Sequence, residues 1–234
     1  NYLAKQNKEV LPVCETITVF TDEEIEKFKS EAYKKYPSGK PKHNQASAYI
    51  LMLNTGLRTA EALGLINSDI DLEKKVMHIQ RADKEAQKRD GTERKNGREI
   101  VVGKLKTASS KRIVPLNETA IQAIIELRNE RYFGEDAPLI PDADGNFTRP
   151  LNLRKRFYSI LDAAGIEKKG LHSLRHTFAT KLVTGVRAED GTVKALTPRQ
   201  VADLLGHTTS EITEMYYVKR NTDMLMGITN EFEL

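Results

Sequence analysis

Apolar residues along most of this chain recur every three or four positions, which is the spacing of amphipathic helices. Helices are predicted from Thr21 to about Tyr33, over 46–55, from Thr59 through Leu65, from Asn117 through Leu127, over 153–164, over 172–183 and from Thr197 to Leu205. Residues suited to cap helix N-termini are Thr21, Thr59, Asn117 and Thr197, and glycines placed to end helices are Gly56, Gly165 and Gly206.

Between residues 75 and 116 the pattern changes to alternation, which is typical of strands. Strands over 75–80, 99–106 and 111–116 would form a three-stranded antiparallel sheet, with Lys106 at the tip of the hairpin that joins the last two. The polar stretch from Asp83 to Arg98 is predicted as a long insertion, and 187–194 as a small hairpin. The expected fold class is mainly α with a small three-stranded antiparallel β-sheet, that is, α+β.

Positive charge is concentrated in one part of the chain. The 234 residues hold 37 Lys or Arg and 33 Asp or Glu, but residues 81–112 alone hold eleven basic and five acidic ones. Beside a phosphate-binding site such an excess would favour nucleic acid through counterion release. On charge alone, a solvated loop explains it equally well.

Cysteine content and hydropathy indicate the compartment. The single cysteine, Cys14, excludes an internal disulfide, and no apolar run approaches the ~20 residues of a membrane span. We therefore expect a cytoplasmic protein that has no membrane partner. The sequence begins Asn-Tyr-Leu without an initiator methionine, and we expect it to be a fragment that lacks an N-terminal part.

Five polar side chains carry the candidate chemistry: Arg58, His172, Arg175, His207 and Tyr216. The two arginines are forked donors suited to phosphate oxygens, the histidines can hold or move protons near neutral pH, and a tyrosine can attack phosphorus. Arg58 lies in a turn between two helices, and His172 and Arg175 share a helix face at i, i+3 spacing. Together they predict phosphodiester chemistry at a site that holds no metal.

Several polar residues in these segments also have a structural interpretation. His172 and His176 have the spacing of a zinc pair but lack a glutamate base and a third ligand, so His176 is interpreted as a core or supporting histidine. Arg175 could instead bridge to a carboxylate inside the fold. Glu61, one turn after Arg58, is interpreted as structural support that orients an arginine or caps a helix. Taken alone, Tyr216 would be a half-buried packing residue.

Four segments in order resemble the catalytic domain of the tyrosine recombinases, or phage integrase family, over about residues 20 to 220: TGLRTAEALGL, KTASSKRIVPL, LHSLRHTFAT and LLGHTTSEITEMYY. The positions that match the catalytic residues of the family are Arg58, Lys106, His172, Arg175, His207 and Tyr216. Tyr216 fits the usual spacing after the histidine better than Tyr217. The insertion leaves Lys104 or Lys111 as alternatives to Lys106.

The resemblance implies a site-specific DNA recombinase, the integrase of a mobile element or phage, that needs no metal, ATP or other cofactor. Tyr216 would form a 3′-phosphotyrosyl link while Arg58 and Arg175 hold the phosphate oxygens. His172 would assist proton removal from the tyrosine, Lys106 would protonate the leaving oxygen, and His207 would donate a hydrogen bond to the phosphate. The alternatives are a Xer-type resolvase of chromosome dimers and a DNA-binding regulator without turnover.

The same resemblance implies a domain division and partners. Residues 1–20 would form a lead-in segment, 21–217 the catalytic domain, and 218–234 a tail that docks on a neighbouring subunit. The partners would be double-stranded DNA at attachment or element-end sites, further copies in a tetramer, and an excision accessory protein. Because no room remains for the N-terminal domain that helps family members to hold the duplex, we expect weak DNA binding by this chain alone.

Overall fold

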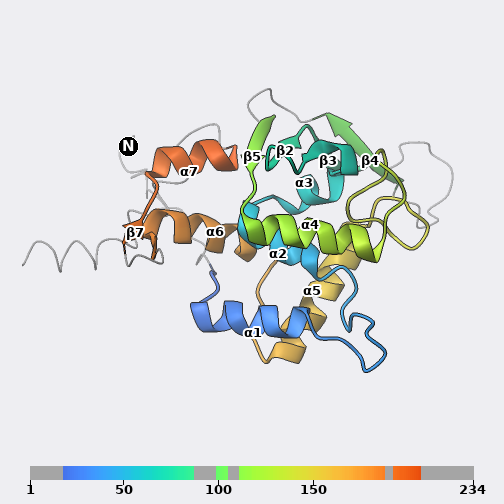
Figure 1. The fold of residues 1–234 in the computed structure, drawn as a ribbon, viewed down its shortest axis with the longest axis horizontal. Helices are drawn as coiled ribbons and strands as arrows, with labels where there is room; N and C mark the ends of the chain where they lie inside the picture. The colour runs from blue at the N-terminus through green and yellow to red at the C-terminus, as the bar shows by residue number, and fades with distance from the viewer. Residues whose placement is uncertain (1–17, 87–98, 105–110, 188–191, 207–234) are drawn as a thin grey trace, which may run out of the picture.

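The computed structural model describes residues 18–86, 99–104, 111–187 and 192–206. Within these ranges the fold is mainly helical, and the strands between residues 70 and 115 lie across one side of the helices (Figure 1). The helices are α1 (Asp22–Ala32), α2 (Ser47–Thr55), α3 (Thr59–Gly64), α4 (Glu118–Glu130), α5 (Pro150–Ala164), α6 (His172–Thr184) and α7 (Pro198–Leu205), with a short 3₁₀ turn, η1 (Asn67–Asp69). The predicted fold class is confirmed.

Most predicted helix ends are confirmed, because they depend on contacts within one turn. The hydroxyl of Thr21 accepts a hydrogen bond from the Glu24 backbone N–H at 3.2 Å, and the side chain of Asn117 accepts one from Ala120 at 2.8 Å. The prediction for α3 is wrong by one residue. Arg58 is the N-cap, and the carboxylate of Glu61, three residues later, accepts the Arg58 backbone N–H at 2.9 Å.

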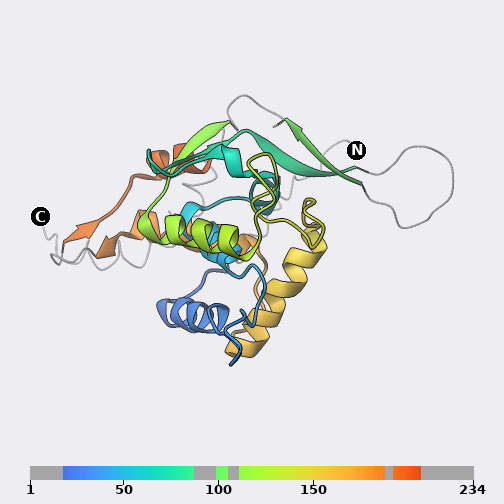
Figure 2. The same ribbon diagram turned by 45° about the vertical axis from the view of Figure 1, so that its right-hand side comes forward.

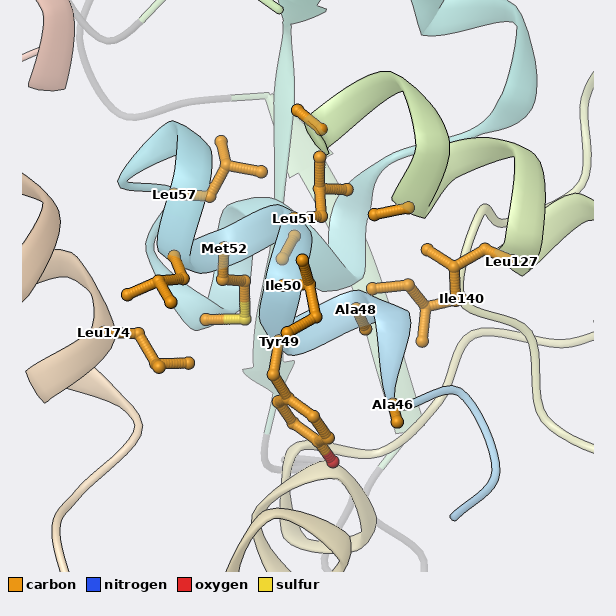
Figure 3. Close-up of a cluster of buried hydrophobic side chains, with 14 of the residues drawn as sticks. Ala46, Ala48, Tyr49, Ile50, Leu51, Met52, Leu57, Leu127, Ile140 and Leu174 are labelled. Atoms are coloured by element: carbon orange, nitrogen blue, oxygen red, sulfur yellow. The ribbon is translucent and has the colours of Figure 1, made fainter. Parts of the chain in front are cut away.

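Helix α2 runs through the centre of the core, between α4 and α6 (Figure 3). We expected one apolar face, but every residue from Ser47 to Leu53 is buried. A helix that is apolar all round belongs inside a core. Its Tyr49 packs against the rings of Phe28 and Phe157 and donates its hydroxyl hydrogen to the Leu153 carbonyl at 2.8 Å. Gly56 ends α2 in the left-handed conformation, as predicted.

A small antiparallel sheet contains three strands, but not the three that were predicted. Its strands are β1 (Ile70–Asp71), β2 (Val76–Ile79) and β5 (Arg112–Pro115), while β3 (Arg81–Ala86) pairs with β4 (Glu99–Lys104) in a separate ladder (Figure 2). The predicted pairing of 99–106 with 111–116 is therefore wrong. Ile79 faces Arg112 and Arg81 faces Lys104, so β3 follows β2 directly after Gln80 but pairs with β4 instead of β5.

Two further predictions concern the inserted segments. Residues 83–86, predicted as part of a polar loop, belong to β3. The small hairpin at 187–194 is confirmed by the pairing of β6 (Val186–Arg187) with β7 (Val193–Lys194).

Phe20, predicted to lie in the lead-in segment, is buried in the core, and its backbone N–H donates to the Thr177 hydroxyl at 2.8 Å. Among the described helices, none has the length and apolar character needed to cross a membrane.

The buried carboxylate of Glu31, at the end of α1, holds the loop that leads to α2. His43 and Lys42 lie 3.0 and 2.7 Å from its oxygens, and Lys34 also pairs with it. Hydrogen bonds from His43, Lys34 and Lys42 lower the pKa of Glu31 from 4.5 to about 2, against the opposing effect of burial. A folded-state pKa below the unfolded value stabilises the fold above about pH 4.5, and this contribution is lost as the pH falls towards 2.

We therefore expect Glu31→Gln to lower the free energy of unfolding at pH 7 by about 2 kcal/mol, because charged hydrogen bonds are lost. The difference from the parent should shrink as the pH falls from 5 to 3. Urea denaturation across that range measures it, with Glu23→Gln on the exposed side of α1 as a control that should change stability by less than about 1 kcal/mol. A difference that stays constant down to pH 3 would contradict this role.

Candidate active site

One carboxylate organises the predicted site. Glu61 on α3 is buried and accepts two hydrogen bonds from the guanidinium of Arg112, each at 3.0 Å. It also accepts the Nη1–H of Arg58 at 2.8 Å, and Nη1 of Arg175 lies 3.9 Å from it. We call these four residues the Glu61 cluster. The predicted supporting role of Glu61, to orient Arg58 and to cap a helix, is confirmed.

The Glu61 cluster carries more positive than negative charge. Burial alone would raise the pKa of Glu61, but the hydrogen bonds and charge of Arg112, with the backbone N–H and the charge of Arg58, outweigh burial and lower it to about 2. The carboxylate is therefore ionised at neutral pH and offsets one of the three guanidinium charges. The excess charge would favour an anion beside the cluster.

Arg58 is the member of the cluster that an anion could reach most readily. It follows the α2–α3 turn, where the extended backbone of Arg58 leads into α3. Its side chain is 37% exposed, against 7% for Arg112 and 3% for Arg175. The bond to Glu61 fixes one edge of its guanidinium, so the group is oriented in advance of binding.

Arg175 is buried inside the fold, and two of its hydrogen bonds go to backbone carbonyls. Nη1 donates to the Gly56 carbonyl at 2.7 Å, and Nη2 donates to the Leu205 carbonyl at 2.9 Å. Its burial therefore needs no phosphate, in contrast to the argument from sequence. The alternative interpretation, a bridge to a carboxylate, applies in part because Glu61 is 3.9 Å away. Arg175 thus joins the ends of α2 and α7.

His172 lies exposed at the first position of α6, next to the two arginines. Partial desolvation, followed by the positive charges of Arg175 and Arg58, lowers its pKa, while Glu61 acts in the opposite direction. The imidazole is therefore neutral near pH 7 and can accept a proton. This is the protonation state that its predicted role requires.

His176 is half-buried, and its ring meets that of His172 edge-on, with centroids 4.6 Å apart. Desolvation, followed by electrostatic repulsion from His172 when it is protonated and from Arg175, lowers the pKa of His176 to about 4. Within the described residues, no group of three His, Cys, Asp or Glu side chains could hold a metal ion around this pair. These contacts agree with the interpretation of His176 as a supporting histidine.

The structure brings Arg58, His172 and Arg175 together, whereas Lys106, His207 and Tyr216 lie outside the described residues, as does Tyr217. Of the alternative lysines, Lys104 ends β4 and Lys111 lies exposed before β5. Helix α7 ends at Leu205, two residues before His207, and Gly206 has the left-handed conformation that was expected for it. The roles assigned to these residues stay predictions.

Arg112 is a member of the cluster that the sequence analysis did not single out. It lies in the quoted KTASSKRIVPL segment, two residues before the buried Val114. Because alternate residues of a strand share a face, that spacing places Arg112 on the buried side of β5, where a charge needs a partner. The alternation therefore indicates that Arg112 is buried, but it does not identify Glu61 as its partner.

Gly56 makes the close contact between the helices that carry the site. It has φ +65°, and a Cβ there would lie 2.5 Å from Cδ1 of Phe178 and 2.6 Å from Cδ2 of Leu205. We expect Gly56→Ala to cost about 3 kcal/mol of unfolding free energy, from overpacking added to left-handed strain. Gly165→Ala is the matched control, since φ at Gly165 is +66° and a Cβ there would meet no other part of the fold within 4 Å. Thermal and urea denaturation would measure both, and equal losses would contradict the packing argument.

A comparison with protein families and curated proteins finds similar sequences. The sequence model of the Phage integrase family matches residues 18–223. A tyrosine recombinase XerC-like protein from Caldanaerobacter subterraneus subsp. tengcongensis is 32% identical, over 92% of this chain and 56% of its own length. The chain spans about half the length of the curated relatives it matches.

Solved structures share the fold. The Tn1549 transposon integrase in complex with a circular intermediate DNA superposes with a TM-score of 0.66 at 21% identity, over 87% of this chain and 62% of that one. A lambda integrase tetramer bound to a Holliday junction gives a TM-score of 0.52 at 16% identity, over 82% and 47%. At these identities the likeness establishes the architecture and leaves the chemistry to the side chains.

Proposed function

Because the chain belongs to the phage integrase family, we propose that it is a site-specific DNA recombinase that cleaves and rejoins strands through a 3′-phosphotyrosyl intermediate. The observation that carries the proposal is the Glu61 cluster with His172 beside it. It places an exposed arginine, a buried arginine and a neutral histidine next to the helix end that leads to His207. Such a group suits an anionic transition state.

In the proposed reaction the hydroxyl oxygen of Tyr216 attacks the scissile phosphorus, and the bond from phosphorus to the 5′ oxygen breaks. His172 accepts the tyrosine proton, Lys106 protonates the leaving 5′ oxygen, and His207 donates a hydrogen bond to the phosphate. Arg58 and Arg175 stabilise the charge on the non-bridging oxygens. The phosphotyrosyl bond conserves the energy needed to rejoin the strand to a new 5′ hydroxyl.

The finer proposal is the integrase of a mobile element or phage, acting in the cytoplasm on attachment or element-end DNA. The inserted β3–β4 and β6–β7 hairpins support it, because the Xer-type alternative would not be expected to carry both. A Xer-type resolvase stays the second candidate, since the curated relatives are named XerC or XerD.

We propose that the protein assembles as a tetramer, by analogy with the lambda integrase tetramer bound to a Holliday junction. Residues 218–234 are proposed to dock on a neighbouring subunit. An excision accessory protein stays a prediction.

Covalent trapping tests the reaction. The parent protein is incubated with nicked duplexes taken from the DNA at both ends of its element, and with a chromosome-dimer resolution site from the same genome. The expected product is a protein–DNA adduct that survives denaturation. Trypsin should release a nucleotide-bearing peptide of residues 200–219, and fragmentation by mass spectrometry should place the nucleotide on Tyr216.

The other outcomes are equally informative. A nucleotide on Tyr217 would keep the reaction and change the nucleophile. An adduct with the dimer-resolution site alone would favour the Xer-type role. Binding without an adduct on every duplex would favour the DNA-binding regulator and overturn the proposed chemistry.

A further inference from the structure

Arg112 is the member of the Glu61 cluster that no predicted catalytic role uses. Its side chain is 7% exposed, and its guanidinium makes three hydrogen bonds to groups in the described part of the chain. Nη1 and Nη2 donate to the two carboxylate oxygens of Glu61 at 3.0 Å each, and Nε donates to the Leu204 carbonyl at 2.9 Å. One planar group therefore connects β5 to both α3 and α7.

The carbonyls at the end of α7 are shared between two arginines. The last four carbonyls of a helix have no partner inside it and carry the negative end of the helix dipole. Arg112 takes the Leu204 carbonyl and Arg175 takes the Leu205 carbonyl, so both guanidinium groups bind the same helix end. Both also lie beside Glu61, which orients Arg58. The position of α7 is thereby tied to that of Arg58.

Gly206 completes this arrangement. It has φ +66°, and its backbone N–H bonds to carbonyls of α7, so the chain turns there towards residue 207. A Cβ on Gly206 would lie 3.0 Å from Nη1 and 3.1 Å from Cδ of Arg112. The guanidinium of Arg112 therefore packs directly against the residue at which the chain leaves the helix.

We propose that Arg112 is a positioning residue: its forked contacts fix the end of α7 against the Glu61 cluster, and so fix where the chain enters the segment that contains His207 and Tyr216. The proposal rests on the proposed recombinase function. The proposed reaction assigns Arg112 no contact with a reacting atom. A lysine would keep the charge but could not bond two carboxylate oxygens and a carbonyl with one planar group, so Arg112→Lys separates geometry from charge.

Two measurements test the proposal in the full protein. The first is single-turnover cleavage of the nicked element-end duplexes together with the affinity for the same DNA. We expect Arg112→Lys to slow cleavage by about 100-fold, the effect of a small misplacement, while affinity stays within about threefold. Arg199→Lys is the matched control, because Arg199 lies on the same helix with 69% of its side chain exposed. It should leave rate and affinity unchanged.

The second measurement does not depend on activity. Hydrogen–deuterium exchange of the peptide that covers Pro198–Gly206 should become at least several-fold faster in Arg112→Lys than in Arg199→Lys, because the end of α7 loses a partner. If Arg112→Lys does not fold, Gly206→Ala replaces it, since a methyl group there displaces the guanidinium. Gly165→Ala then controls for left-handed strain, because it has the same φ and no atom within 4 Å.

The two measurements separate the possible failures. Slower cleavage with faster exchange at the end of α7 would support the proposal. Unchanged cleavage in Arg112→Lys, with an active parent, would overturn it and leave the recombinase function standing. If the parent forms no adduct, the recombinase function fails, and exchange alone decides whether Arg112 holds the end of α7. Exchange equal to that of Arg199→Lys would overturn that contact.

Discussion

Glu61→Gln is expected to lower the free energy of unfolding by about 3–5 kcal/mol at pH 7, the cost of leaving buried charges without their partner. The Glu61 carboxylate accepts two hydrogen bonds from the guanidinium of Arg112, and one each from the backbone and the side chain of Arg58. It also lies 3.9 Å from Nη1 of Arg175. An amide keeps one acceptor oxygen but loses the charge that offsets the guanidinium groups. Urea denaturation of the parent and the variant measures the loss.

The loss should depend on pH with a definite sign. The folded-state pKa of Glu61 is about 2, below the ordinary value of 4.5, so the carboxylate stabilises the fold above about pH 4.5. That contribution is lost as the pH falls from 4.5 towards 2, and the parent should approach the variant there. Glu118→Gln, which removes an exposed carboxylate paired with Lys75, should show no such dependence.

A double variant separates charge from packing. Replacing Arg112 with Met in the Glu61→Gln background removes a guanidinium that has lost its partner, so it should recover part of the stability that the single change costs. Additive losses in the two changes would mean that the pair is not coupled. A Glu61→Gln protein within about 1 kcal/mol of the parent would likewise contradict the central place of this carboxylate.

The parts of the fold that the sequence predicted best depend on neighbours along the chain. The caps at Thr21, Asn117 and Thr197 each involve a residue three positions later, and all three are confirmed. The link between Arg58 and Glu61 has the same spacing and was expected. Even the error at α3 is local, since the N-cap is Arg58 instead of its neighbour Thr59, and Glu61 binds the Arg58 backbone N–H from three residues away.

The errors arise where the partner is distant or where both sides of a strand are polar. Strand β3 reads Arg-Ala-Asp-Lys-Glu-Ala and has no apolar face, so alternation could not separate it from a loop. Because β3 pairs with β4, the three-stranded sheet contains β1 in the place that was predicted for residues 99–106. The contacts of Arg112 with Glu61 and Leu204 span 51 and 92 residues, and no pattern along the chain encodes them.

The two arginines that are proposed to bind the phosphate, Arg58 and Arg175, should respond differently to the same substitution. Arg58→Lys is expected to slow single-turnover cleavage by about 10²–10³-fold, the usual cost of losing one donor to a developing charge. It should change stability by less than about 1 kcal/mol, because its side chain is 37% exposed and its backbone N–H still caps α3. Cleavage of nicked duplexes and urea denaturation measure the two effects separately.

Arg175→Lys should lose a comparable part of the cleavage rate and, in addition, about 3 kcal/mol of stability. Its two bonds to the Gly56 and Leu205 carbonyls are buried, and a single ammonium cannot replace both at once. Stability and rate would then both fall in Arg175→Lys, whereas the rate alone would fall in Arg58→Lys. If Arg58→Lys cost as much stability as Arg175→Lys while cleaving at the parental rate, Arg58 would be a structural residue, and the cluster would need another group to bind the phosphate.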